Sequence, residues 1–324
     1  PGGHRGGVLK FDRRFREEGA MVVGRIGRAV CRLLSAPEAA KIMRREMARD
    51  PGFALDENPY CADCVRFRGK IKAARLSGED FRLSAPIWPL QEDLAPVLDR
   101  IQGEGIACVE VHTEGFDPPF AALEDVRKRL AKRALSIVAL RTHWRPIGDT
   151  EALCKTATRM GAECVCLAAP ETAVMSRSQL VAALQSLAQV ACESGVNLFL
   201  GNRSDSLVAT AAGLASLIAK VGASHVKANY APAEIVHLGG SPFYGGLYKG
   251  RLRGVLGHVD LQDMVANEGR VVRAGSGNCE IREMVSNLRC RSFNGLFCLW
   301  PLPGQGAEGY REAAEGFWEI MDRI

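Results

Sequence analysis

From residue 81 onward, short apolar runs alternate with segments of helical periodicity, and this alternation limits the possible folds more than any other feature. The apolar runs cover 81–88, 107–113, 135–143, 163–170, 197–203, 224–231, 254–261 and 295–301. The helical patterns cover 91–103, 120–132, 150–160, 178–194, 206–221, 279–289 and 306–323. Strands that alternate with helices form right-handed βαβ units and a parallel sheet.

The number of these units favours a closed barrel. Eight strands with intervening helices predict a (β/α)8 TIM barrel over residues 81–324. An open, doubly wound sheet is the alternative. Such a sheet usually has fewer strands and a Gly-rich phosphate turn after an early strand, and no such turn stands in the sequence.

The first 80 residues differ from the rest in charge. Residues 1–80 hold 17 Lys and Arg against 11 Asp and Glu, a balance of +6, whereas residues 81–324 hold 25 against 26, a balance of −1. The pattern over 19–49 predicts helices that pack on the barrel or on another chain. We therefore expect a mostly helical N-terminal extension over 1–80 that binds a protein partner or a second copy of the chain. A solvated basic helix face is the alternative, and nucleic acid is not expected.

Cysteine usage and hydropathy indicate the cellular setting. The eleven cysteines show no framework of pairs, which favours a reducing, cytoplasmic location. No apolar run approaches the roughly 18 residues that a membrane span needs, so no membrane partner is expected. Cys61 and Cys64 have the spacing of half a zinc site or of a redox pair, with free thiols as the alternative.

In a TIM barrel the active site lies where the strands end. The polar and aromatic residues at the ends of the predicted strands are Glu110, His112, Arg141, His143, Glu171, Asn202, Arg203, Asn229, Glu234, His258, Asp260 and Trp300. Within "GHVDLQD" (257–263), His258 and Asp260 stand two apart on one strand and point to the same side. This pair is either half of a metal site or what remains of one.

The second half of the chain resembles a known family. The segments "GVNLFLGNR", "VKANYAPAEIVHLGGSP", "LGHVDLQD" and "GSGNCEIREMVSNLRCRSFNGLFCLW" follow one another at the spacing of the xylose isomerase-like TIM barrels, the superfamily of sugar-phosphate isomerases and epimerases. The resemblance covers residues 81–324 and is strongest after 195. It implies a sugar-like ligand and one divalent metal, often manganese, held by Glu, Asp, His and Glu at four strand ends.

This sequence departs from the family at all four of those ligand positions. They are occupied by Gly201, Ala231, Asp260 and Trp300, and Glu234 replaces a family His. The family's Gly-Glu-Gly turn is Gly275-Ser276-Gly277. Hard divalent cations need several oxygen or imidazole ligands, so the resemblance predicts a barrel that has lost its metal. A rearranged site on His258, Asp260 and Glu234 is the alternative.

Two classes of function follow. The first is a pseudoenzyme, a metal-free barrel that acts as a binding or assembly subunit. The second is an isomerase, epimerase or lyase that works on a sugar or polyol without the metal. The catalytic candidates are Glu234, His258, Asp260 and His143, and the candidates for substrate binding are Asn202, Arg203, Arg141, Lys227, Asn229 and Trp300. In the second class, Lys227 or Arg141 would stabilise an enediolate.

Several candidates also have a purely structural interpretation. Arg141 and His143 can form a strand-end ion pair with Glu110 or Glu171 instead of binding an anion. Ser204 can cap a helix that starts at "GNRSD". Trp300 is expected to plug the mouth of the barrel, and lining an open ligand site is its alternative. The Gly-rich loop 239–254 is a candidate basic lid.

Overall fold

The computed structural model describes residues 81–324 except 90–93, 115–119, 250 and 292. The predictions for residues 1–80, including the helices over 19–49 and the site at Cys61 and Cys64, lie outside the described residues. Residues 81–281 and 294–323 form one compact unit, and 282–293 are grouped in the other. Among the described residues, no helix is long and apolar enough to cross a bilayer.

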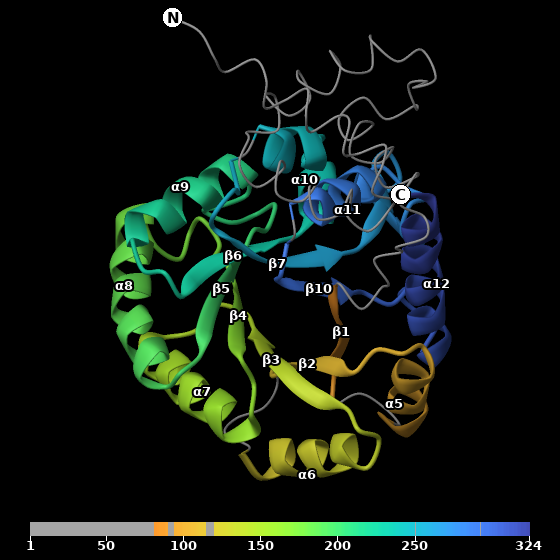
Figure 1. The fold of residues 1–324 in the computed structure, drawn as a ribbon. Helices are drawn as coiled ribbons and strands as arrows, with labels where there is room; N and C mark the ends of the chain where they lie inside the picture. The colour runs from red at the N-terminus through yellow and green to blue at the C-terminus, as the bar shows by residue number, and fades with distance from the viewer. Residues whose placement is uncertain (1–80, 90–93, 115–119, 250, 292) are drawn as a thin grey trace, which may run out of the picture. The chain divides into compact units, whose positions relative to one another are not determined.

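Eight parallel strands close into a barrel, as the sequence predicts (Figure 1). They run β1-β10-β7-β6-β5-β4-β3-β2 around the ring, and β1 pairs with both β2 and β10. Their bounds are β1 Arg82–Ile87, β2 Cys108–His112, β3 Ser136–Thr142, β4 Cys164–Ala168, β5 Asn197–Gly201, β6 Val226–Tyr230, β7 Leu256–Leu261 and β10 Leu296–Leu299. Every strand lies within its predicted run, so the (β/α)8 prediction is confirmed.

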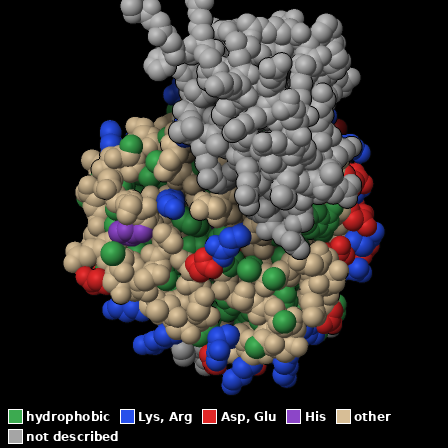
Figure 2. Space-filling view, viewed as in Figure 1, with side chains coloured by type: hydrophobic (Ala, Val, Ile, Leu, Met, Phe, Trp, Pro, Cys, Tyr) green, Lys and Arg blue, Asp and Glu red, His purple; other side chains and the backbone are tan. Residues whose placement is uncertain are grey.

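The seven predicted helices are also present. They are α5 Leu94–Gly103, α6 Phe120–Ala131, α7 Ile147–Met160, α8 Arg177–Glu193, α9 Ala211–Val221, α11 Ile281–Cys290 and α12 Ala307–Arg323. Helices α5 to α9 and α12 lie outside the ring of strands in Figure 1. Lys and Arg side chains are spaced around the rim of the face in Figure 2, several beside an Asp or Glu.

Helix α9 starts later than the sequence predicts. Thr210 is its N-cap, and the Thr210 side chain accepts a hydrogen bond from the Gly213 N–H. The interpretation of Ser204 as a helix cap is therefore wrong. Residues 202–210 form a loop at the end of β5, which leaves Asn202 and Arg203 at the carboxyl edge of the barrel.

Three further elements interrupt the alternation after β6 and after β7. A short helix, α10 (Pro232–His237), and a π-helical segment, η3 (Phe243–Tyr248), lie between β6 and β7. A small antiparallel hairpin of β8 (Asp263–Val265) and β9 (Arg270–Val272) follows β7. The predicted lid, 239–254, thus contains η3, and its role as a lid stays a prediction.

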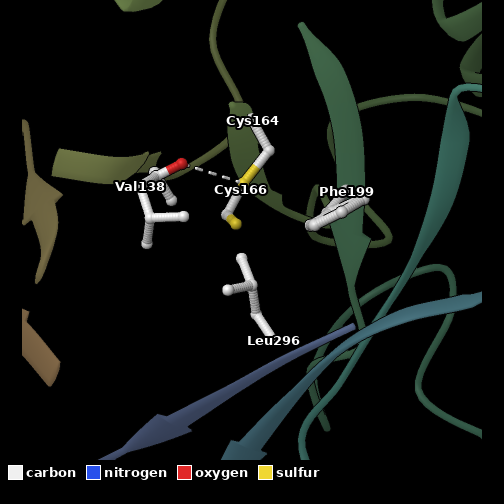
Figure 3. Close-up of a cluster of buried hydrophobic side chains, with 6 residues drawn as sticks. Val138, Cys164, Cys166, Phe199 and Leu296 are labelled. Atoms are coloured by element: carbon white, nitrogen blue, oxygen red, sulfur yellow. Dashed lines mark hydrogen bonds between the residues drawn. The ribbon is translucent and has the colours of Figure 1, made fainter. Parts of the chain in front are cut away.

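A cluster of buried hydrophobic side chains packs together inside the barrel (Figure 3). Val138, Cys164, Cys166, Phe199 and Leu296 are at most 6% exposed, and they come from four strands. The Cys164 thiol donates to the Val138 carbonyl at 3.4 Å. This packing lies beside the polar residues, since Leu296 is paired with His258 and Cys166 with Arg141 in the strand register.

Candidate functional site at the carboxyl end of the barrel

Four charged side chains meet inside the barrel. Glu110 comes from β2, Arg141 from β3, and His258 and Asp260 from β7. Glu110 and His258 are fully buried, Asp260 is 6% exposed and Arg141 is 8% exposed. Charges this deep are stable only when they are paired and hydrogen-bonded.

Arg141 is the centre of this charged cluster. Its Nη1 donates to Glu110 Oε2 at 2.7 Å and to Asp260 Oδ1 at 2.8 Å. Its Nη2 donates to Asp260 Oδ2 at 2.8 Å. Arg141 therefore holds Asp260 in a bidentate pair and also binds Glu110, so the expected alternative of an ion pair between Arg141 and Glu110 is confirmed.

His258 is held on both ring nitrogens. Its Nδ1 lies 2.8 Å from Asn229 Oδ1, and its Nε2 lies 2.7 Å from Glu110 Oε1. The Asn229 amide nitrogen donates to Asp260, so the Asn229 oxygen faces His258 as an acceptor. Both imidazole nitrogens thus face acceptors, and the hydrogen-bond network assigns a proton to each of them.

The pKa values follow from this arrangement. Burial alone would lower the pKa of His258, but the adjacent Glu110 carboxylate raises it to about 9. Burial would raise the pKa of Asp260, but Arg141 and His258 hold it below its usual range. The pKa of Glu110 is lowered in the same way, against burial, by His258 and Arg141. Two cations and two anions cancel, so the charged cluster is neutral near pH 7.

The strands adjust locally to bring these residues together. The pairing of β2 with β3 shifts register between Val109 and Glu110, and that of β6 with β7 shifts between Ala228 and Asn229. Both shifts fall next to a residue that hydrogen-bonds to His258, namely Glu110 on β2 and Asn229 on β6. Bulges of this kind re-aim side chains next to functional sites.

We expect stability to fall at alkaline pH because of His258. Its folded pKa, about 9, lies above the ordinary value of 6.5. The stabilisation is therefore full below pH 6.5 and is lost as the pH rises through 9. The raised pKa of His258 contributes about 3 kcal/mol to the free energy of unfolding below pH 6.5. Urea unfolding between pH 6 and 10 measures it. The His258→Gln variant should lack this pH dependence, and an equal slope in both proteins would contradict the assignment.

Three aromatic rings form the layer next to Arg141. Trp88 stacks on His112 with ring centroids 4.5 Å apart, and both rings contact Trp300, at 5.7 and 5.5 Å. The Arg141 guanidinium carbon lies 5.2 Å from the centroid of the Trp300 ring. Trp300 thus lies against Arg141, and we call Trp88, His112 and Trp300 the aromatic mouth. Whether Trp300 plugs the barrel or lines a ligand site stays a prediction.

A second group of charges lies at the rim. Glu114 Oε2 is 3.1 Å from His112 Nδ1, and Glu114 Oε1 is 3.9 Å from His143 Nε2. Arg203 lies on the other side of His143, with Nη1 3.5 Å from His143 Nδ1, and it donates to Asp205 at 2.7 Å. His143 and Arg203, both predicted as site residues, are therefore neighbours.

Three other predicted residues lie outside the charged cluster, and two of them have structural partners. Asn202 makes two hydrogen bonds with the backbone of Ala231, which joins the ends of β5 and β6. Glu234 accepts the Ser204 backbone N–H at 2.7 Å. Lys227 is two residues before Asn229 on β6, about 6–7 Å nearer the opposite end of the barrel. The charged cluster thus contains His258, Asp260, Arg141 and Asn229 but neither Glu234 nor Lys227 among its hydrogen-bonded members.

The residues at the predicted ligand positions do not fit the divalent metal that the resemblance implies. Asp260 has both oxygens bound by Arg141. The space beside Gly201 is taken by the Asn229 amide, 3.4 Å from where a Cβ would lie. Two donor groups elsewhere, Glu110–Cys166–His258 and His258–Asp260–Cys298, have ligand atoms within 4.8 Å of one another. Both groups share His258, whose two nitrogens already face hydrogen-bond acceptors.

Some residues of the site were not predicted as functional. Glu110 interrupts the apolar run "ACVEVHT", and a carboxylate in the middle of a buried strand is a usable signal for an internal ion pair. Glu110 and His112 were noted as strand-end residues, and Glu110 also as an ion-pair partner of Arg141, but neither was among the catalytic or binding candidates. Trp88 and Glu114 gave no signal, because their role depends on which strands are neighbours in the barrel.

Comparison with known proteins supports the fold. A scan against protein-family models finds no match, and a search of curated proteins finds no relative. Among solved structures, a xylose isomerase domain protein from Planctomyces limnophilus superposes with a TM-score of 0.62 at 15% identity, covering 75% of this chain and 98% of its own. This chain has the fold of the xylose isomerase-like TIM barrels.

Two further structures with this fold carry descriptive titles. An IolI protein with a bound zinc atom has a TM-score of 0.62 at 15% identity and covers 75% of this chain and 99% of its own. A D-psicose 3-epimerase from Clostridium cellulolyticum H10, solved with D-tagatose, has a TM-score of 0.58 at 13% identity and covers 75% of this chain and 98% of its own. The structural neighbours are thus sugar isomerase-like and epimerase proteins, and the predicted resemblance is confirmed at the level of the fold.

Proposed function

We propose that this protein is a metal-independent barrel that binds a small, sugar-like ligand at the aromatic mouth. The observation that supports it is the position of Arg141. Its guanidinium occupies the oxygens of Glu110 and Asp260 that a divalent cation would need. Arg141 and His258 supply two positive charges at the centre, so the carboxylates are balanced without an ion.

The same contacts argue against acid–base chemistry in the charged cluster. His258 and Asp260 were two of the four catalytic candidates, but each uses its polar atoms on a neighbour and lies out of solvent. The pKa of His258 is raised and that of Asp260 is lowered, so both groups stay charged near pH 7 and do not exchange protons readily there. We therefore place the ligand next to the cluster, against Trp88, His112 and Trp300.

The aromatic mouth suits a hydroxylated ring. Aromatic faces pack against the apolar faces of sugars, and the Trp300 indole N–H is a donor for a hydroxyl oxygen. Within the described residues, the Trp300 Nε1 is buried and has no hydrogen-bond partner. A ligand oxygen at this atom would satisfy it.

The experiment is binding in the absence of metal. The full chain with Cys61→Ser and Cys64→Ser, dialysed against EDTA, is titrated calorimetrically with D-fructose and D-tagatose. We expect saturable binding that manganese does not strengthen, weakened about 5- to 10-fold in Trp300→Phe, which keeps an aromatic ring but loses the indole N–H and its hydrogen bond. Tyr244→Phe is the control, because Tyr244 is exposed outside the mouth. One tightly held metal per chain, or binding only after manganese is added, would contradict the proposal.

A second candidate function is a metal-free isomerase or epimerase. One observation favours it, the unpartnered His112 Nε2 at the aromatic mouth. The assembly role predicted for residues 1–80 and the cytoplasmic location also stay predictions. Deleting residues 1–80 and measuring solubility and assembly size tests the assembly role.

A further inference from the structure

Two buried polar atoms at the aromatic mouth have no hydrogen-bond partner among the described residues. They are His112 Nε2 and Trp300 Nε1, on rings whose centroids are 5.5 Å apart and nearly perpendicular. Leaving one such atom unpaired costs about 1–3 kcal/mol, and native structures contain few of them. A pair of unsatisfied atoms on two neighbouring rings indicates a place where a ligand binds.

The hydrogen-bond network fixes which nitrogen of His112 carries a proton. Glu114 Oε2 lies 3.1 Å from His112 Nδ1, and a carboxylate can only accept from it. Neutral His112 therefore has its proton on Nδ1, and its Nε2 has a free lone pair. Stacking of Trp88 on the His112 ring holds the imidazole in this orientation.

The network also fixes the proton of His143. The Arg203 guanidinium, a donor only, lies 3.5 Å from His143 Nδ1. The proton of neutral His143 is then on Nε2, which faces Glu114 Oε1 at 3.9 Å. At that distance, directly or through one water, His143 donates to Glu114 and takes no proton from it. One carboxylate thus lies between two imidazole N–H groups.

Exposure increases along this series. The side chains of His112, Glu114 and His143 are 11%, 32% and 65% exposed. Glu114, which contacts His112 and is partly exposed, therefore connects a buried lone pair to bulk water. In the described residues, Glu114 is the charged side chain that hydrogen-bonds to His112, and Arg141 is the neighbour of His112 in the strand register. Arg203, with its partners Asp205 and Glu171, faces His143.

We propose that His112 and Glu114 form a proton relay between the aromatic mouth and solvent, with His143 as a hydrogen-bond donor that orients Glu114. A ligand hydroxyl gives its proton to His112 Nε2, and the electron pair stays on the ligand oxygen, which accepts from Trp300 Nε1–H. The Nδ1 proton of His112 passes to Glu114, and Glu114, which is 32% exposed, releases it to water. His112 is the catalytic residue of this step. The proposal rests on the proposed function only in taking the mouth as the ligand site.

The test needs no ligand, so it can fail independently of the proposed function. Full-length protein with 15N-labelled histidine is studied by NMR, and His112 and His143 signals are assigned with His112→Gln and His143→Gln. We expect neutral His112 to show the Nδ1–H tautomer. We also measure the rate at which its ring proton exchanges with water.

Glu114→Gln separates the relay from a structural role. The amide oxygen of Gln still accepts from His112 Nδ1, but the amide cannot take up and release a proton. We expect an unchanged tautomer and exchange slowed by about a hundredfold, the size of a positioned proton-transfer effect. His143→Gln should change the rate little, because His143 only donates to Glu114. Glu171→Gln is the matched control, since Glu171 lies at the rim without contacting either histidine in the described residues.

Two results would overturn the proposal. The first is an Nε2–H tautomer of His112, because no lone pair would then face the mouth. The second is exchange in Glu114→Gln as fast as in the unmodified protein, because the carboxylate would then only orient the ring. If Glu114→Gln unfolds, the tautomer of His112 in the unmodified protein decides alone.

Discussion

Arg141→Ala is expected to destabilise the barrel by about 3–5 kcal/mol at pH 7, the cost of removing one partner from a buried ion pair. The change leaves Glu110 and Asp260 facing each other without the guanidinium that now bonds to both. His258 alone then balances two carboxylates. Urea unfolding of the variant and the unmodified protein, followed by circular dichroism, measures the difference.

The loss of stability caused by Arg141→Ala should be smaller at acidic pH. In the unmodified protein the pKa values of Glu110 and Asp260 are held low, so their stabilisation is present above about pH 4.5 and is lost as the pH falls. In Arg141→Ala these carboxylates can take up protons at higher pH, which removes the uncompensated charge. The gap between the two proteins is therefore largest near pH 7 and smaller near pH 4.5.

Zinc should partly rescue Arg141→Ala but not the unmodified protein. Without the guanidinium, the carboxylate oxygens of Glu110 and Asp260 that it binds are free. With Cys166 or Cys298, and with His258 once it gives up a ring proton, they can bind a cation through oxygen, nitrogen and sulfur ligands. Zinc at 100 times its Kd would restore about 2.7 kcal/mol. Cys61→Ser and Cys64→Ser are introduced in both proteins. Equal stabilisation by zinc in both would show that Arg141 does not block metal binding.

Arg145→Ala is the matched control for the loss of an arginine at this strand end. Arg145 donates to Thr142 Oγ1 at 2.7 Å and to the Thr113 carbonyl at 3.0 Å, and neither partner is charged. Its loss should cost about 1 kcal/mol and create no zinc site. A loss as large as that of Arg141→Ala would mean that the charged cluster contributes little beyond packing.

The strands and the barrel could be predicted because their signal is local. The period of the apolar runs and the strict alternation with helices fix the topology, since βαβ units are right-handed and consecutive strands are neighbours. The elements that were missed, such as η3 and the β8–β9 hairpin, are short and depend on tertiary contacts. Ser204 was mistaken for a cap because the residue type is compatible with several loop conformations.

The site was predicted only in part, because most of its contacts join residues that are far apart in the sequence. His258 and Asp260 could be paired from the sequence because they stand two apart on one strand. Their partners Glu110 and Arg141 lie on β2 and β3, and only the closed ring brings them together with β7. Sequence position likewise gave no reason to separate Lys227 from Asn229, although the two lie at different heights in the barrel.

Asp263 explains why position 277 is a glycine. Its Oδ1 accepts the backbone N–H groups of Met264 and Cys279, and its Oδ2 accepts those of Gly275 and Gly277, all at 2.9 Å. A Cβ at Gly277 would overlap the Asp263 carboxylate. Glycine at position 277 therefore serves the close approach of backbone to a buried carboxylate.

Asp263→Ala is expected to cost at least about 3 kcal/mol, because four backbone donors lose an ionised acceptor in a site that is 1% exposed. The hairpin after β7 and the turn that carries Gly275 and Gly277 are held together by this one side chain, so the loss should be local before it is global. Hydrogen exchange at the amides of Gly275, Gly277 and Cys279 should accelerate more than exchange at β7, and urea unfolding gives the total. Asp205→Ala is the control, since its exposed pair with Arg203 is worth about 1 kcal/mol or less. Uniform acceleration across the barrel, or a cost no larger than that of Asp205→Ala, would refute this role for Asp263.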